Sequence, residues 1–86
     1  METRTEKLQR IEIMGEVTKI TIVEIGVNNT RTAYITVRTE VGEYRVTAPE
    51  SGRTPDFDEI RPGTIVLVTG RLKQDGQIIA HNIEII

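Results

Sequence analysis

The sequence predicts an all-β fold, a small barrel of five strands with one short helix between the third and the fourth strand. Three observations support this. Runs rich in Ile, Val and Thr alternate with a period of two, tight-turn signals separate them, and the region 49–63 holds all three prolines, which prevent a long helix. Since 86 residues leave room for one core, we expect a single domain over 11–86, preceded by a polar tail or short helix over 1–10.

The first strand is expected to be long and strongly curved, extending from Ile11 to Val27. Its apolar row is Ile11, Ile13, Val17, Ile20 and Ile22. The alternation slips by one residue near Thr18-Lys19, which is typical of a β-bulge. A bulge bends a strand and lets it take part in both halves of a small barrel. Asn28-Asn29 then ends the strand, because asparagine tolerates left-handed backbone.

The next two strands are expected over 32–39 and 43–48, joined by a tight turn at Val41-Gly42. The side chains expected to point inward are those of Ala33, Ile35, Val37, Tyr44, Val46 and Ala48. The intervening residues are polar and belong on the solvent face. This pattern predicts that Tyr44 is buried and that Tyr34 is exposed.

A short helix is expected at Thr54–Ile60, within the irregular region. Thr54 is a suitable cap, Pro55 suits the first helical position, and the acidic residues that follow suit the positive end of the helix dipole. Phe57 and Ile60 are three residues apart and share one face. We expect them to plug the open end of the barrel.

The last two strands, over 64–73 and 77–86, form a hairpin around Asp75-Gly76, since this pair supplies the positive φ that a tight turn needs. The run Ile65–Val68 is apolar at every position, which predicts a strand buried on both faces. His81 alternates with Ile79, Ile83 and Ile85 on the fifth strand, so a structural histidine on a half-buried apolar face is expected.

Composition argues against several classes of function. The chain has no cysteine and one histidine, so neither a metal site nor a cofactor is predicted. No serine lies in a nucleophile elbow, and the acidic cluster of Asp56, Asp58 and Glu59 lacks the spacing of a calcium loop, so we expect no enzyme. Nor does an apolar run reach the length of a membrane span, and the charged beginning does not fit a secretory signal, so a cytoplasmic protein is expected.

The order of elements resembles the OB-fold (oligonucleotide/oligosaccharide-binding) family over about Ile11 to Ile86. The features shared are a long bent first strand, a helical plug before the fourth strand, and a Pro-Gly entry into an apolar strand that ends at Gly70-Arg71. The run IVLVTGRL from Ile65 is closest to members that bind single-stranded nucleic acid. The resemblance implies a ligand across the outer face of the second and third strands, framed by the loop after the first strand and the loop of the last hairpin.

Seven residues fall on those places: Tyr34, Thr36, Arg38 and Arg45 on the face, Arg31 in the first loop, and Arg71 and Lys73 in the last hairpin. Arginine and lysine neutralise phosphates, and a tyrosine ring stacks on an unpaired base. Single-stranded DNA or RNA, bound with weak sequence preference, is therefore the expected partner. Aromatic residues are few, which predicts modest affinity.

Other interpretations stay open at this point. Arg38 and Arg45 lie near Glu40 and Glu43, and cross-strand ion pairs are common on solvated sheets. Tyr34 would also serve to cover apolar surface, and Lys19 to protect a strand edge. A protein-interaction or scaffold subunit would use the apolar C-terminal strand for a partner or for self-association. The regular strands are also compatible with an engineered sequence that has no natural ligand.

Overall fold

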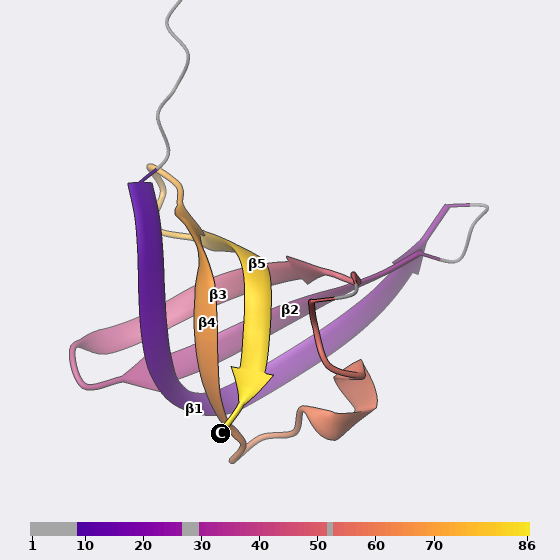
Figure 1. Ribbon diagram of the computed structural model, residues 1–86, viewed down its shortest axis with the longest axis horizontal. Helices are drawn as coiled ribbons and strands as arrows, with labels where there is room; N and C mark the ends of the chain where they lie inside the picture. The colour runs from indigo at the N-terminus through magenta and orange to yellow at the C-terminus, as the bar shows by residue number, and fades with distance from the viewer. Residues whose placement is uncertain (1–8, 27–29, 52) are drawn as a thin grey trace, which may run out of the picture.

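Five strands close into a barrel in the computed structural model, which describes residues 9–26, 30–51 and 53–86 (Figure 1). In chain order the elements are β1 (Gln9–Ile25), β2 (Thr30–Thr39), β3 (Gly42–Pro49), the 3-10 helix η1 (Phe57–Glu59), β4 (Ile65–Leu72) and β5 (Ile78–Ile85). Around the barrel the strands follow the order β1-β2-β3-β5-β4. The predicted fold class and element order are confirmed. No helix within the described ranges is long and apolar enough to cross a membrane.

β1 is shared between the two halves of the barrel. Its first part, from Gln9 to Glu16, pairs with β4, and its second part, from Glu16 to Ile25, pairs with β2. The register against β2 shifts between Val17 and Lys19, which leaves Thr18 as the extra residue of a β-bulge. The predicted bulge and its role in bending the strand are thus confirmed.

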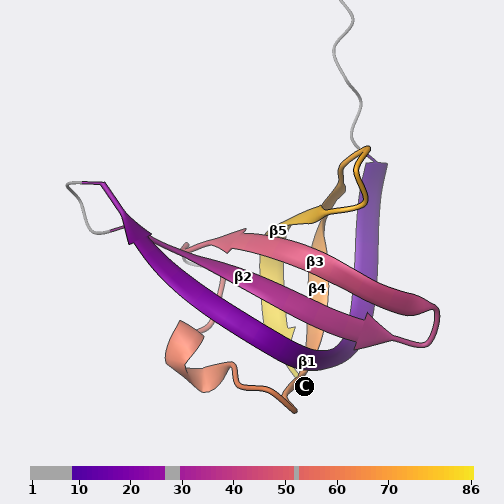
Figure 2. The ribbon, with the colours of Figure 1, turned by 180° about the vertical axis from the view of Figure 1, so that it is seen from behind.

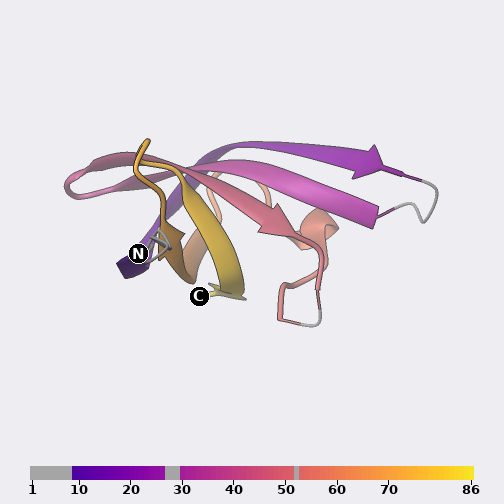
Figure 3. The same cartoon turned by 90° about the horizontal axis from the view of Figure 1, so that it is seen from above.

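The ends of β1 differ from the sequence prediction. The strand begins at Gln9, so Gln9 and Arg10, assigned to the tail, take part in the barrel. The expectations for residues 1–8 and for Asn28-Asn29 concern positions outside the described part of the chain. Near its other end, β1 projects with β2 beyond the closed part of the barrel (Figure 3). Ile22 pairs with Ala33 on β2 and is 37% exposed, so the expected apolar row is not buried along its whole length.

The core is formed by one side of each strand, with Val17, Ile35, Val46, Val66 and Ile78 each at most 2% exposed. On β2 and β3 the burial alternates as predicted. Tyr44 is half-buried and packs against the core, whereas Tyr34 is 45% exposed. Tyr34 is therefore exposed as predicted, whereas Tyr44 packs against the core but is only half-buried.

β4 is buried on one face only, so the prediction of burial on both faces is wrong. Val66 and Val68 are fully buried, but Ile65 is 41% exposed and Leu67 is half-buried. The reason is architectural. The barrel has a single layer of strands, so the outward side chains of β4 have no second layer to cover them.

The prediction for His81 is also wrong, because β5 contains a bulge of its own. The β4–β5 register shifts between Thr69, which pairs with Asn82, and Gly70, which pairs with Ala80. His81 is therefore the extra residue. Ala80 and Ile83 point inward, while His81 is exposed rather than packed on an apolar face.

η1 closes one end of the barrel, as predicted. Phe57 and Ile60 are 1% and 2% exposed, and both belong to the core. The helix is one 3-10 turn capped by Asp56, whose carboxylate accepts from the Asp58 N–H at 3.0 Å. The expected Thr54 cap is wrong, because the Thr54 hydroxyl is used in the preceding turn, where it donates to the Ser51 carbonyl at 3.0 Å.

The barrel is closed by a short seam between β3 and β5. These two strands run parallel and are paired only at Val46 with Ile78 and at Thr47 with Ile79. Every other neighbouring pair of strands is antiparallel and longer. The tight β4–β5 hairpin brings β5 to this seam, and Gly76 has φ 91° in its turn, as the Asp-Gly signal predicts.

Candidate nucleic-acid interface

The outer side of β2 and β3, together with the second half of β1, forms a broad curved surface (Figure 2). We call it the open face and define it by the outward residues Lys19, Thr21, Tyr34, Thr36, Arg38, Arg45 and Thr47. The three strands are paired in register, so these side chains line up in rows across the sheet, where opposite Cβ atoms are about 5 Å apart.

The first row places an aromatic ring between two small side chains. Tyr34 pairs with Thr21 on β1 and with Thr47 on β3. Because both neighbours are short, the exposed ring is accessible from above. A flat ring held on a rigid strand is a suitable stacking partner for an unpaired base.

The second row carries two cations. Thr36 pairs with Lys19 on β1 and with Arg45 on β3, and both charged side chains are exposed. Two strand spacings, about 10 Å, separate Lys19 from Arg45. Neither has an ion pair among the residues that the structure describes. The row therefore presents positive charge next to the Tyr34 ring.

The third row is acidic at both ends. Arg38 pairs with Glu43 on β3, and its guanidinium forms a salt bridge with Glu16 on β1, Nη2 to Oε1 3.0 Å. The ion-pair interpretation therefore applies to Arg38, although the acid is not one of those named from the sequence. Arg38 lies on the open face, but Glu16 already balances part of its charge. Lys19 and Arg45 are therefore the main cations of the open face.

The structure does not bring Arg31 to the open face. β2 begins at Thr30, so Arg31 is part of the strand and not of the loop, and alternation puts its side chain on the same side as Ala33 and Ile35. There its Nη2 lies 2.9 Å from Glu50 Oε2, and its Cζ lies 5.6 Å from the centre of the Phe57 ring. Arg31 thus joins β2 to the region around η1.

Because of this contact, the free energy of unfolding is expected to decrease at acid pH. The hydrogen bond from Arg31 holds the pKa of Glu50 below its usual value of 4.5. A carboxyl whose folded-state pKa is lowered stabilises the fold above its unfolded pKa and loses that contribution as pH falls through the folded value. We expect Glu50→Gln to melt at a lower temperature than the wild type at pH 7, and this difference to disappear as the pH falls through the lowered folded-state pKa of Glu50. A difference that stays constant with pH would contradict this assignment.

Arg71 and Lys73 lie on the β4–β5 hairpin side of the open face. Lys73 Nζ is 3.9 Å from Asp75 Oδ2, within the hairpin turn. Arg71 is exposed near the end of β4 and pairs with Ile79 on β5. Ile79 also pairs with Thr47 across the seam, so Arg71 continues the Tyr34 row around the barrel. Four of the seven predicted residues, Tyr34, Thr36, Arg38 and Arg45, thus lie on the open face. Arg71 is connected to it through Ile79 and Thr47, and Lys73 lies in the hairpin turn.

Two basic residues outside the predicted site lie on these rows, namely Lys19, which the sequence interpretation assigned to protecting a strand edge, and Arg10. The bulge near Lys19 was visible in the alternation, and counting outward positions from it would have placed Lys19 on the outer face of β1, but its position beside Thr36 follows only from the register between β1 and β2. Arg10 pairs with Arg71, at the far end of the Tyr34 row. Its omission followed from starting β1 two residues late.

A comparison with protein families identifies the family to which this chain belongs. The family model named tRNA anti-codon and described as an OB-fold nucleic acid binding domain matches residues 11–86. The chain belongs to this OB-fold family, as the resemblance predicted. A comparison with curated proteins gave no match.

Proposed function

We propose that this protein is a binding module for single-stranded nucleic acid with weak sequence preference, and that it is not an enzyme. The observation that carries the proposal is the adjacency of the Tyr34 ring to the row of Lys19, Thr36 and Arg45 on the open face of a chain that belongs to a nucleic-acid-binding family. Stacking acts on any base and phosphate contacts carry no sequence information, so this set of residues favours weak preference.

Each residue has a distinct role in this proposal. Tyr34 stacks on one base, Lys19 and Arg45 neutralise phosphates on either side of it, and the hydroxyls of Thr36 and Thr47 are placed to hydrogen-bond to sugar or base. The acidic row around Arg38 limits the strand to the basic part of the face. The name of the matching family favours RNA as the first ligand to test.

Loss of the Tyr34 ring is expected to weaken binding by about 1–3 kcal/mol, roughly 5- to 150-fold. Fluorescence anisotropy of labelled single-stranded RNA and DNA oligomers, titrated with wild type and with Tyr34→Ala, measures this directly. Tyr34→Phe is the matched control, because it keeps the stacking ring and removes only the hydroxyl. If Tyr34→Phe is as weak as Tyr34→Ala, stacking is not the role of this residue.

Salt dependence tests the phosphate contacts in the same titrations. Each contact to a single strand lowers the slope of log K against log salt by about 0.7. Arg45→Gln should therefore make the slope shallower by about that amount, whereas Tyr34→Ala should leave it nearly unchanged. No binding of either oligomer at low salt and high protein concentration would refute the proposed function.

One observation favours a second candidate, a protein-interaction subunit. Met14, Ile65 and Ile86 are 58%, 41% and 65% exposed on the outside of β1 and β4 and at the end of the chain after β5. Acidic side chains of Glu12 and Glu84 lie next to them on the same strands. The partner that fits is a segment with apolar and basic side chains, because a second copy would bring like charges together.

A further inference from the structure

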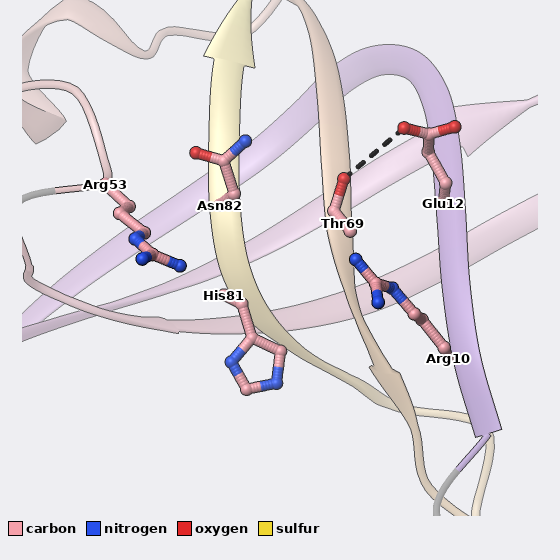
Figure 4. A pocket seen from close by; sticks show the side chains of 6 residues that line it. All are labelled: Arg10, Glu12, Arg53, Thr69, His81 and Asn82. Atoms are coloured by element: carbon pink, nitrogen blue, oxygen red, sulfur yellow. Dashed lines mark hydrogen bonds between the residues drawn. The ribbon is translucent and has the colours of Figure 1, made fainter.

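An open hollow of about 470 Å³ lies on the outer side of β1, β4 and β5, away from the open face. It is lined by Arg10, Glu12, Arg53, Thr69, His81 and Asn82 (Figure 4). Five of these side chains, all except Glu12, can donate hydrogen bonds, and the two arginines among them carry a permanent positive charge.

The bulge in β5 creates the polar floor of this hollow. In a regular strand two consecutive side chains point to opposite faces. Here Ala80 and Ile83 both point inward, and His81 and Asn82 between them both line the outside. Thr69, the partner of Asn82 on β4, completes the floor. Bulges that re-aim side chains in this way are frequent next to binding and active sites.

Two arginines face each other across this floor. Figure 4 shows Arg10 extending from β1 and Arg53 extending from the opposite side, from the connection between β3 and η1. The Arg53 segment is held against β5, because the Ile83 N–H donates to the Arg53 carbonyl at 3.2 Å. Residues far apart in the sequence are thus fixed at one site by backbone pairing.

The charge in the hollow favours an anion. Within the described part of the chain neither Arg10 nor Arg53 forms an ion pair. The one acid present, Glu12, accepts a long hydrogen bond from Thr69 Oγ1 at 3.5 Å. A tetrahedral anion with several acceptor oxygens fits two guanidinium groups, an imidazole, an amide and a hydroxyl.

We propose that this hollow is a phosphate-binding site, and that it holds the backbone of the nucleic-acid strand as that strand leaves the open face. The second part of this inference rests on the proposed function. Continuity supports it, since the Tyr34 row passes through Thr47, Ile79 and Arg71 to Arg10, one paired residue at a time. The path from Thr47 to Arg10 crosses three strand spacings, about 15 Å. A nucleic-acid strand that is bound at Tyr34 therefore reaches the hollow only if it has enough nucleotides to cover this distance.

Oligomer length provides the test. OB-folds cover about 4 to 16 nucleotides, so a 4-mer occupies the open face and a 12-mer extends to the hollow. We expect Arg53→Gln to weaken 12-mer binding by about 3- to 10-fold and to reduce its salt slope by about 0.7, with no effect on the 4-mer. Arg61→Gln, an equal charge change at an exposed arginine outside the hollow, is the matched control. Glu12→Gln should strengthen 12-mer binding.

The outcomes separate this inference from the proposed function. If both oligomers bind and Arg53→Gln behaves like Arg61→Gln, the hollow does not hold the strand and the inference is overturned. If neither oligomer binds to the wild type, the proposed function fails. NMR titration with inorganic pyrophosphate then decides whether the hollow binds phosphate on its own. Shifts of the His81 and Asn82 amides that disappear in Arg53→Gln would support a site for free phosphate, and their absence would overturn it.

Discussion

Phe57→Ala is expected to lower the free energy of unfolding by about 3–5 kcal/mol. The Phe57 side chain is 1% exposed and belongs with Ile60 to the core. The helix η1 that carries Phe57 lies below the projecting part of β1 and β2 (Figure 1). Removing the ring opens a cavity that the surrounding strands cannot fill without breaking their pairing. The Arg31 guanidinium near the ring would lose its aromatic partner as well.

Urea unfolding followed by far-UV circular dichroism measures this loss. Phe57→Leu keeps most of the buried volume and should lose much less stability. Val41→Ala, at a position that is 82% exposed, should change the free energy by no more than about 0.5 kcal/mol. A loss below about 1 kcal/mol for Phe57→Ala would mean that η1 does not pack as a plug.

Gly70→Ala is expected to cost about 3 kcal/mol or more, at the upper end of the range for an overpacked site. A Cβ at this position would overlap the Ile79 carbonyl oxygen and lie 2.9 Å from Ala80 Cα. Both obstacles are backbone atoms, so no side-chain rotation relieves the clash. β5 would have to move away from β4 at the bulge that exposes His81 and Asn82.

Gly76→Ala is the matched control for this change. Gly76 has φ 91° and nothing within 4 Å of an added Cβ, so alanine there is strained without a clash and should cost about 1–2 kcal/mol. Thermal melting compares the two variants, and NMR shows whether the His81 and Asn82 amides move in Gly70→Ala. Equal losses of stability would contradict the close approach of β4 and β5.

The sequence was sufficient to predict the elements whose signals are local. The bulge in β1 was visible because the expected apolar row, Ile11, Ile13, Val17, Ile20 and Ile22, passes from odd to even positions at Thr18-Lys19. The Asp-Gly turn and the pair Phe57 and Ile60 were equally clear. The bulge in β5 was not, because isoleucines occupy both parities from Ile78 to Ile86 and every register buries some of them.

Other features depended on information that no single strand contains. The apolar run Ile65–Val68 fits a strand buried on both faces. The outer face of β4 is exposed because no second layer covers it, and the sequence of β4 alone does not contain this information. The row of Lys19, Thr36 and Arg45 requires the register of three strands, whereas alternation gives only the face of each side chain. Arg31 was predicted in the loop that frames the ligand face. Because β2 starts at Thr30, Arg31 belongs to the strand, and alternation turns its side chain away from that face.

The two-residue seam between β3 and β5 has a consequence for motion. Closure depends there on Val46 and Thr47 paired with Ile78 and Ile79, so this junction is where the ring of strands opens at the lowest free-energy cost. Thr47 and Ile79 are also outward neighbours on the path from the open face to Arg71. A nucleic-acid strand bound over both residues would stabilise the closed barrel. By thermodynamic linkage, a mutation that weakens the pairing of β3 with β5 would also lower the affinity for the nucleic acid.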